Sequence, residues 1–252
     1  MKNAILCADN LCKSFFQGGR EIQILKAVTE KIYEGDFTVI MGASGAGKST
    51  LLYALSGMDS ITGGELTFQG QRMNGLSEKK MAELRAEKFG FVFQQTHLVS
   101  NLTMFENVAV AGAVGKVKSE KAVREKALHL LRQMHVDGAK DRLPSQVSGG
   151  EAQRTAIARA MINDPELIFA DEPTGALNRS NSKEVLNLLT ELNENGQSIL
   201  MVTHDIKAAV RGNRILYLED GQILDEISLA PYHQEEKERE DRVNGWLSSL
   251  RW

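Results

Sequence analysis

The sequence lacks several features that define whole classes of protein. Its 252 residues include two cysteines, Cys7 and Cys12, which form neither a CxxC pair nor a disulfide framework, so we expect reduced thiols. No stretch reaches the ~18 consecutive apolar residues of a membrane-spanning helix; the longest candidate, residues 108–114, is short and rich in Ala and Gly. The first residues contain no apolar signal region, which predicts a cytoplasmic chain.

An excess of positive charge is also missing. The chain carries 30 Lys and Arg against 33 Asp and Glu, for a formal net charge of -3. Because nucleic-acid binding needs clustered Lys and Arg, we expect no nucleic-acid partner. The hydrophobic fraction of 42% and the charged fraction of 25% are ordinary for a globular protein, and the length allows one large or two small domains.

Short apolar runs predict the strands of a parallel sheet. Residues 37–41 are rich in β-forming side chains, and residues 167–170 and 198–202 are continuous apolar runs, as expected of strands covered on both faces. Between the last two, apolar residues at helical spacing precede Asn195-Gly196, which predicts a helix that ends there. The order strand, helix, strand indicates an α/β core.

Other segments differ from this core. Asp220-Gly221 lies between two apolar runs and predicts an antiparallel hairpin, because Gly supplies a positive φ. Residues 95–145 contain a helical stripe and are interpreted as an inserted helical subdomain; the stripe consists of Val123, Ala127, Leu130, Leu131 and Met134. The charged stretch 234–242 predicts a solvated helix, with contact to a partner as the alternative.

These patterns give a predicted domain division. Residues 1–94 and 146–226 would form the α/β core, residues 95–145 the helical subdomain, and residues 227–252 a charged C-terminal tail.

A glycine-rich loop carries the strongest chemical signal. The pattern Gly42-x4-Gly47-Lys48-Ser49 follows a predicted strand and precedes a helix that Gly57 would end. Glycines let successive backbone N–H groups point at phosphate oxygens, assisted by the positive end of the helix. Lys48 would lie between the β- and γ-phosphates, while Ser49 would bind Mg²⁺. The predicted phosphate-binding residues are Gly42, Ser44, Gly45, Ala46, Gly47, Lys48, Ser49 and Thr50.

The loop alone leaves kinases, GTPases and ATPases open, and an acidic strand end narrows the choice. Residues 167–170 are apolar and are followed by Asp171 and Glu172, at the sheet edge where α/β proteins bind ligands. Asp171 is predicted to hold Mg²⁺ through its water shell. Glu172 is placed to polarise a water for in-line attack on the γ-phosphate.

A second anion-binding turn precedes a helix without any lysine. Ser148-Gly149-Gly150-Glu151 has the features of a helix N-terminus that receives an anion. One chain does not need two γ-phosphate sites. We therefore interpret this turn as serving a nucleotide held by a second copy of the protein.

In order and spacing, these motifs resemble those of the ABC ATPases. The resemblance covers residues 3–226 and rests on Gly42–Thr50, Val147–Glu151, Leu167–Glu172 and Thr203–Asp205. It implies a P-loop NTPase core of the RecA-like kind, with a mostly parallel sheet, an antiparallel β subdomain and an inserted α-helical subdomain. It also implies a head-to-tail dimer that holds two ATP molecules with Mg²⁺, each between the loop of one subunit and the Ser-Gly-Gly turn of the other.

The resemblance implies three further site residues. Phe15 would stack on adenine, Gln94 would meet Mg²⁺ and the attacking water, and His204 would contact the γ-phosphate. The alternatives are that Phe15 belongs to the core, that Gln95 is the loop glutamine, and that His204 is an ordinary strand-end residue.

Three positions depart from the family pattern. Val147 and Glu151 replace the usual Leu and Gln of the signature, and Asn178 stands where most members carry Asp. The signature changes are mild, and Asn178 keeps an acceptor oxygen but loses a charge. The lost charge bears on the strength of communication across the dimer rather than on hydrolysis itself. We expect an active ATPase that is slower than typical.

Within the family, residues 91–98 and 101–108 resemble the branch that serves lipoprotein release, macrolide efflux and antimicrobial-peptide resistance. This resemblance implies an FtsX-like permease as partner and a peripheral position at the inner face of the cell membrane. A soluble ABC-type ATPase acting on nucleic acid or ribosomes is disfavoured, because such relatives carry long insertions or tandem cassettes. A weakly hydrolysing regulatory subunit is the other alternative, and Asn178 is its only support.

Overall fold

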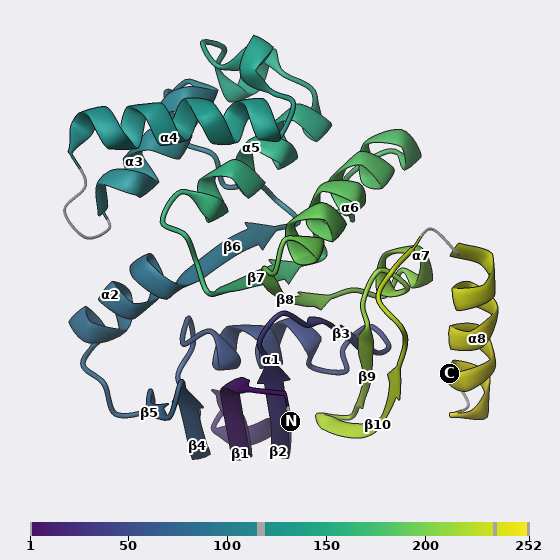
Figure 1. Ribbon diagram of the computed structural model, residues 1–252. Coiled ribbons are helices and arrows are strands. Elements are labelled where there is room, and N and C mark those ends of the chain that lie inside the picture. Colours follow the sequence, from purple (N-terminus) through teal and green to yellow (C-terminus); the bar gives the residue numbers. More distant parts are fainter. Residues whose placement is uncertain (1, 115–118, 234–235, 251–252) are drawn as a thin grey trace. The chain divides into compact units, whose positions relative to one another are not determined.

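The computed structural model describes residues 2–114, 119–233 and 236–250 (Figure 1). The chain divides into two compact units, one formed by residues 1–81 and 193–252 and the other by residues 82–192. Residues 234–235 and 251–252 of the predicted charged tail lie outside the described residues.

The first unit contains the predicted parallel strands. Strand β3 (Phe37–Met41) pairs in parallel with β8 (Ser198–Val202) on one side and with β9 (Arg214–Glu219) on the other. Every residue of β3 and β8 is buried, as the apolar runs predicted. Strand β10 (Gln222–Ser228) adds to β9 antiparallel, and Asp220 and Gly221 turn between them with positive φ. The predicted hairpin is therefore confirmed.

An antiparallel sheet forms the rest of this unit. Its strand order is β2-β1-β4-β5, and the strands are β1 (Ala4–Gln17), β2 (Arg20–Tyr33), β4 (Gly63–Phe68) and β5 (Gln71–Arg72). Helix α1 (Lys48–Leu55) contacts β1, β2 and β8 and buries its leucines, so it packs between the two sheets. Helix α7 (Ile206–Ala209) is a single turn that contacts β3.

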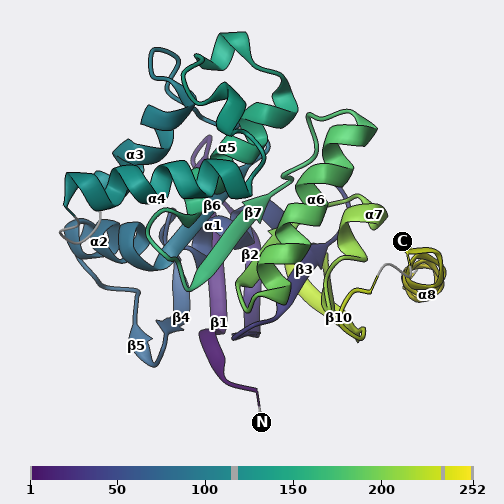
Figure 2. The same ribbon diagram turned by 45° about the horizontal axis from the view of Figure 1, so that its top comes forward.

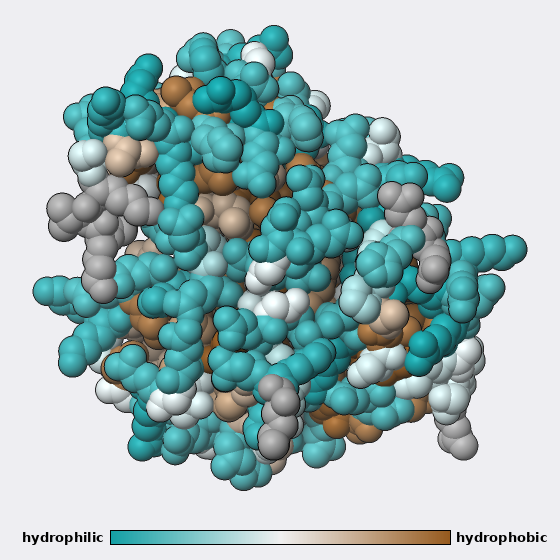
Figure 3. Space-filling model, in the orientation of Figure 1, coloured by the Kyte–Doolittle hydropathy of each residue, from teal (hydrophilic) through white to brown (hydrophobic). Residues whose placement is uncertain are grey.

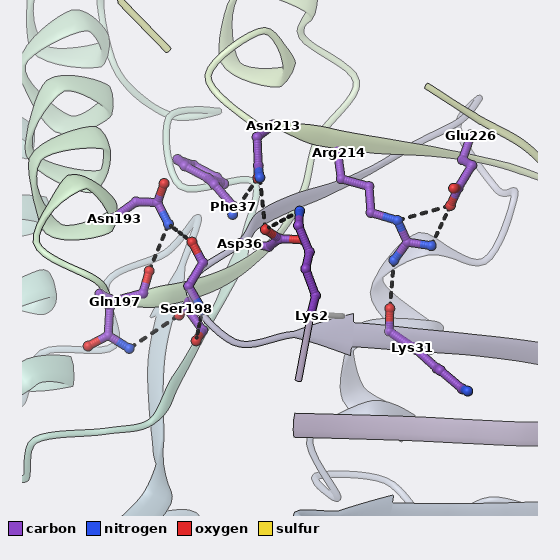
Figure 4. A network of polar contacts seen from close by, with 11 residues as sticks. Lys2, Lys31, Asp36, Phe37, Asn193, Gln197, Ser198, Asn213, Arg214 and Glu226 are labelled. Carbon is purple, nitrogen blue, oxygen red and sulfur yellow. Dashed lines mark hydrogen bonds and ion pairs between the residues drawn. The ribbon is translucent and has the colours of Figure 1, made fainter. Parts of the chain in front are cut away.

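A polar network anchors the amino ends of the parallel strands (Figure 4). The Asp36 carboxylate accepts hydrogen bonds from Lys2 Nζ at 2.8 Å and from Asn213 Nδ2 at 2.8 Å. Asn213 Oδ1 in turn accepts from the Phe37 N–H at 2.8 Å. Because Asp36 is buried, these donors satisfy a charge that would otherwise be costly to remove from water.

Arg214 links the two sheets of this unit. At the start of β9, its guanidinium donates to the Lys31 carbonyl on β2 and forms an ion pair with Glu226 on β10 (Figure 4). It forms a second ion pair with Glu30 on β2. Burial opposes the charge, but the hydrogen bonds and charges of the two glutamates outweigh it and raise the pKa of Arg214. The fork of donors on Arg suits this bridging position better than a single ammonium would.

The C-terminal helix is attached to the first unit by a buried arginine. Helix α8 (Glu236–Ser249) packs on α7. Arg239 is 6% exposed and donates to the carbonyls of Val210 at 2.7 Å, Gly212 at 2.7 Å and Ala230 at 2.6 Å. These carbonyls include the end of α7, where unpaired acceptors need a partner.

Further contacts hold both ends of α8. Glu236 accepts hydrogen bonds from Arg211 and from the Tyr232 hydroxyl, and Trp246 Nε1 donates to Asp225 at 2.9 Å. Burial, together with the hydrogen bond to Glu236, raises the pKa of Tyr232 to about 12. The helix predicted in the charged tail is present, but it is not simply solvated as we expected. Its buried side consists of Arg239, Val243 and Leu247, and of these only the charged Arg239 lies in the predicted stretch 234–242.

The second unit contains two parallel strands and a group of helices. Strand β6 (Phe89–Phe93) pairs with β7 (Leu167–Asp171). Figure 2 shows α3, α4 and α5 side by side, and these helices contact one another. The predicted apolar stripe on α4 is buried. The helices are α3 (Met104–Val114), α4 (Glu120–Gln133), α5 (Gly149–Met161) and, each with one end in the first unit, α2 (Glu78–Lys88) and α6 (Arg179–Glu194).

Among the described residues, no helix is both long enough and apolar enough to cross a membrane. On the face seen in Figure 3, most of the visible side chains are hydrophilic, with hydrophobic ones in small areas between them.

Arg239 provides a test of how α8 is attached. Replacing Arg239 with Ala leaves three carbonyls without their donor, and we expect the free energy of unfolding to fall by about 2–4 kcal/mol. Arg242→Ala is the matched control, because within the described part of the chain Arg242 donates only to the exposed Ser228 carbonyl. This replacement should cost less than about 0.5 kcal/mol. Urea denaturation of both variants measures the difference. Equal losses of unfolding free energy in the two variants would show that the buried hydrogen bonds of Arg239 do not stabilise the attachment of α8.

Candidate functional site

The glycine-rich loop lies at the carboxyl end of β3. Its residues Ala43, Ser44 and Gly45 are exposed, whereas Gly42 and Ala46 on either side are buried. Gly45 and Gly47 have positive φ, so the chain curls between the strand and α1 as a phosphate-binding loop requires.

The start of α1 has the character of an anion site. No side chain caps its N-terminus, and its first turn contains no acidic residue. The Lys48 ammonium folds back over the loop and donates to the carbonyls of Gly42 at 2.8 Å and Ala43 at 3.0 Å. A positive helix end and a cation beside exposed loop residues fit the phosphates of a nucleotide.

The β9–β10 hairpin holds the loop from one side. The Gly221 N–H donates to the Ala46 carbonyl at 3.1 Å. A Cβ on Gly42 would lie 2.1 Å from the Leu218 carbonyl oxygen, and one on Gly221 would lie 1.9 Å from the Ile24 carbonyl oxygen. Only glycine permits these two backbone approaches, which fix the loop against the strands.

His204 and Phe15 belong to the same unit as the loop. His204 follows β8, whose carboxyl end lies beside that of β3 because the Thr203 N–H donates to the Ile40 carbonyl at 3.2 Å. The next residue, Asp205, caps α7 by accepting from the Lys207 N–H, so His204 is held between a strand and a capped turn. Phe15 lies on β1 and is 43% exposed, so its ring is not a core side chain.

The acidic strand end and Gln94 belong to the second unit. Asp171 is the last residue of β7 and is buried, and Glu172 follows it with a positive φ of 45°. Gln94 follows the parallel neighbour β6. A Cβ on Gly175 would lie 2.8 Å from Gln94 Nε2, so Gln94 packs on the loop that begins at Glu172. This contact favours Gln94 over Gln95 as the glutamine beside the acidic strand.

The Ser-Gly-Gly turn begins α5. Ser148 caps this helix, and its hydroxyl accepts from the Glu151 N–H while donating to the Glu151 carboxylate. A Cβ on Gly150 would lie 2.5 Å from the Asn181 side chain, so the turn packs closely against the start of α6. The small residues of the turn thus permit a close approach between two helix N-termini.

Asn178 has a structural role that explains its side chain. Its Oδ1 accepts from the Asn181 N–H at 3.0 Å and so caps the N-terminus of α6. Asn and Asp cap helices about equally well. The Asn that departs from the family pattern therefore preserves this local geometry.

Two residues of α5 were missed by the sequence analysis. Gln153 is 1% exposed and its Nε2 donates to the Phe93 carbonyl at 2.9 Å, while Arg159 donates to the carbonyls of Thr96 and His97. Together they hold the segment that contains Gln94. Burial lowers the pKa of Arg159. The only sequence signal was that polar side chains fall among the apolar residues of a predicted helix.

The predicted site residues are thus divided between the two units. The loop, Phe15 and His204 lie in the first, and Gln94, Asp171, Glu172 and the Ser-Gly-Gly turn lie in the second. The glycine loop after a buried parallel strand defines the class as a P-loop α/β protein that binds nucleotide phosphates.

Comparison with known proteins identifies the family. The ABC transporter family model matches residues 25–175. A dimeric structure of the ATP-binding cassette MJ0796 in a post-hydrolysis state, bound to ADP and Pi, is 38% identical to this chain, with a TM-score of 0.82, and covers 90% of this chain and 100% of its own. A second dimeric structure of MJ0796, a bacterial ABC transporter cassette, is 39% identical over the same shares, also with a TM-score of 0.82.

A more distant structure covers more of the chain. CbiO1 from Clostridium perfringens, part of the ABC transporter complex CbiONQ, is 25% identical with a TM-score of 0.81, and covers 99% of this chain and 94% of its own. The chain belongs to the ABC transporter family, and it is an ATP-binding domain of the kind found in that family. It has the predicted α/β fold of a P-loop NTPase, and it is an ATPase.

The close approach at Gly42 predicts a specific defect. A methyl group at this position would collide with the Leu218 carbonyl, so Gly42→Ala should displace the start of the loop and weaken ATP binding at least about tenfold. Gly70→Ala is the control, because an added methyl there meets open space even though the backbone has φ +75°. It should lower stability but leave ATP affinity unchanged. Fluorescent-nucleotide titration measures both, and equal affinities for the two variants would contradict the role of this contact.

Proposed function

We propose that this chain is the ATP-hydrolysing subunit of an ABC transporter that drives a separate membrane permease. The observation that carries the proposal is the glycine-rich loop at the carboxyl end of β3. The helix that follows this loop has no side-chain cap, and the Lys48 ammonium donates back to a loop carbonyl. This arrangement suits the triphosphate of ATP.

The proposed nucleotide ligands come from several segments of the chain. In this proposal Gly42, residues 44–50 and Phe15 bind ATP, with Phe15 against the adenine. Ser49 and Asp171, with Gln94, would hold Mg²⁺, which is usually bound by one or two carboxylates together with substrate phosphates. When bound, Mg²⁺ would neutralise charge on the phosphate oxygens.

Hydrolysis is assigned to residues beside the phosphates. Glu172 would orient and polarise the attacking water, Gln94 would position that water, and His204 would contact the γ-phosphate. Support comes from the packing of Gln94 on the loop that follows Glu172, and from the capped turn that holds His204 beside the end of β3. A positioned base typically contributes about 10²–10⁴ in rate.

We propose that two subunits associate head to tail. Ser148, Gly149 and Gly150 of one subunit would then contact the γ-phosphate of ATP held by the other. The two MJ0796 structures are both of dimers. ATP would close the dimer because its γ-phosphate bridges the two subunits, and hydrolysis would remove that bridge.

The proposed partner is a permease of the FtsX-like kind at the inner face of the membrane. CbiO1, one of the similar structures, is part of a transporter complex. In this proposal residues 95–145 form a helical subdomain that is inserted into a core formed by residues 1–94 and 146–226. The permease would dock near residues 95–108, a segment whose Thr96 and His97 carbonyls accept hydrogen bonds from Arg159 of α5.

Replacing Glu172 with Gln tests the catalytic assignment. The variant should bind ATP but hydrolyse it about 10²–10⁴ times more slowly, because its amide cannot act as a base. Saturating ATP should convert it to a dimer, which light scattering detects. Glu194→Gln, at the exposed end of α6, removes an equivalent charge and should hydrolyse ATP at the parent rate. A monomeric Glu172→Gln variant at saturating ATP would contradict the dimer.

The permease assignment has its own test. The tagged chain, purified from gently solubilised native membranes, should bring with it a stoichiometric permease with few spanning helices and a large extracytoplasmic domain. Mass spectrometry identifies the partner. Recovery with ribosomes or DNA instead would favour a soluble ABC-type ATPase.

A further inference from the structure

The hydroxyl of Ser148 is already engaged within its own helix. Ser148 Oγ donates to Glu151 Oε2 at 2.8 Å, and the Ser148 N–H donates to the same oxygen at 2.8 Å. In return, Ser148 Oγ accepts from the Glu151 N–H at 3.2 Å. A serine hydroxyl has one proton to donate. In this arrangement the hydroxyl proton is donated to the Glu151 carboxylate.

The Glu151 charge is stabilised where it stands. The hydrogen bonds from the backbone and hydroxyl of Ser148 lower the pKa of its carboxyl, with smaller contributions from the charges of Arg142 and Arg154. Arg154 also forms an ion pair with Glu184. Glu151 is half-buried and Ser148 is exposed, and the carboxylate lies within hydrogen-bond distance of the Ser148 hydroxyl.

The hydrogen bonds between Ser148 and Glu151 form a capping box, and the same unit contains a second capping box with the same pattern of hydrogen bonds. At the start of α3, Thr103 Oγ1 donates to Glu106 Oε2 at 2.8 Å, the Thr103 N–H donates to that oxygen at 2.7 Å, and Thr103 Oγ1 accepts from the Glu106 N–H at 3.2 Å. The pKa of Glu106 is lowered by the same two hydrogen bonds. The two boxes give their helices the same cap, so a comparison of the two separates capping from any effect on ATP.

We propose that Glu151 is a positioning residue that restrains ATP-dependent dimer closure by holding the Ser148 hydroxyl. This inference rests on the proposed function, in which Ser148 meets the γ-phosphate of the partner's ATP. The phosphate and the Glu151 carboxylate are both acceptors and both negative. They compete for one hydroxyl proton, and they repel each other at short range.

Closure therefore requires the hydrogen bond from the Ser148 hydroxyl to the Glu151 carboxylate to break. A glutamine at position 151 would still accept from the hydroxyl, but through a neutral oxygen that binds it about half as strongly, and it would carry no repelling charge. We infer that Glu151 sets a higher ATP threshold for closure than a glutamine would, and that it lets the dimer reopen more readily.

The test uses the Glu172→Gln chain as parent, because it should hold ATP without turnover. Adding Glu151→Gln should lower the ATP concentration for half-maximal dimer formation about fivefold, as measured by light scattering at fixed protein concentration. Glu151→Ala, which cannot hold the hydroxyl through its side chain, should shift the midpoint in the same direction.

Glu106→Gln in the same parent is the matched control. Both glutamine variants lose a carboxylate in the first turn of a helix, so both should lower the thermal midpoint of the nucleotide-free chain by similar amounts. Only Glu151→Gln should move the ATP midpoint. An unchanged or raised ATP midpoint for Glu151→Gln, or an equal shift for Glu106→Gln, overturns the inference while leaving the dimer intact. A parent that never forms a dimer overturns the dimer, and with it this inference.

Discussion

The burial of strand β3 between β8 and β9 is the constraint on which the rest of the first unit depends. A strand with no exposed residue cannot satisfy its ends through water, so each end is held by protein groups. At the amino end, Asp36 and Asn213 provide them. At the carboxyl end the chain leaves the sheet through Gly42, which touches the backbone of Leu218. The position of the phosphate loop follows from this fixed strand.

Much of this architecture could be predicted from local patterns. The continuous apolar runs of β3, β7 and β8 reflect burial on both faces, a property that each run carries in itself. The positive φ values at Asp220 and Gly221 follow from the residues of a two-residue turn. The glycine loop was recognisable for the same reason, because its chemistry depends on residues that are neighbours in sequence.

The rest could not be predicted, because it depends on partners distant in sequence. Arg239 is charged and lies in a charged segment, yet it is buried against carbonyls near α7 that no local pattern identifies. Gln153 similarly satisfies the Phe93 carbonyl, 60 residues earlier. The engagement of the Ser148 hydroxyl was also missed. A Ser and a Glu three residues apart predict a helix cap, but not that the cap would occupy a group assigned to ATP.

Two hairpin turns of the first unit differ in how freely their sequences can vary. Gly221 lies against the Ile24 backbone, so the β9–β10 turn has no room for even one methyl group. Gly70, in the β4–β5 turn, also has positive φ but faces open space. An inserted peptide tag or fluorescent reporter would therefore be accommodated in the β4–β5 turn, whereas the β9–β10 turn transmits any change in its length directly to Ala46 of the phosphate loop.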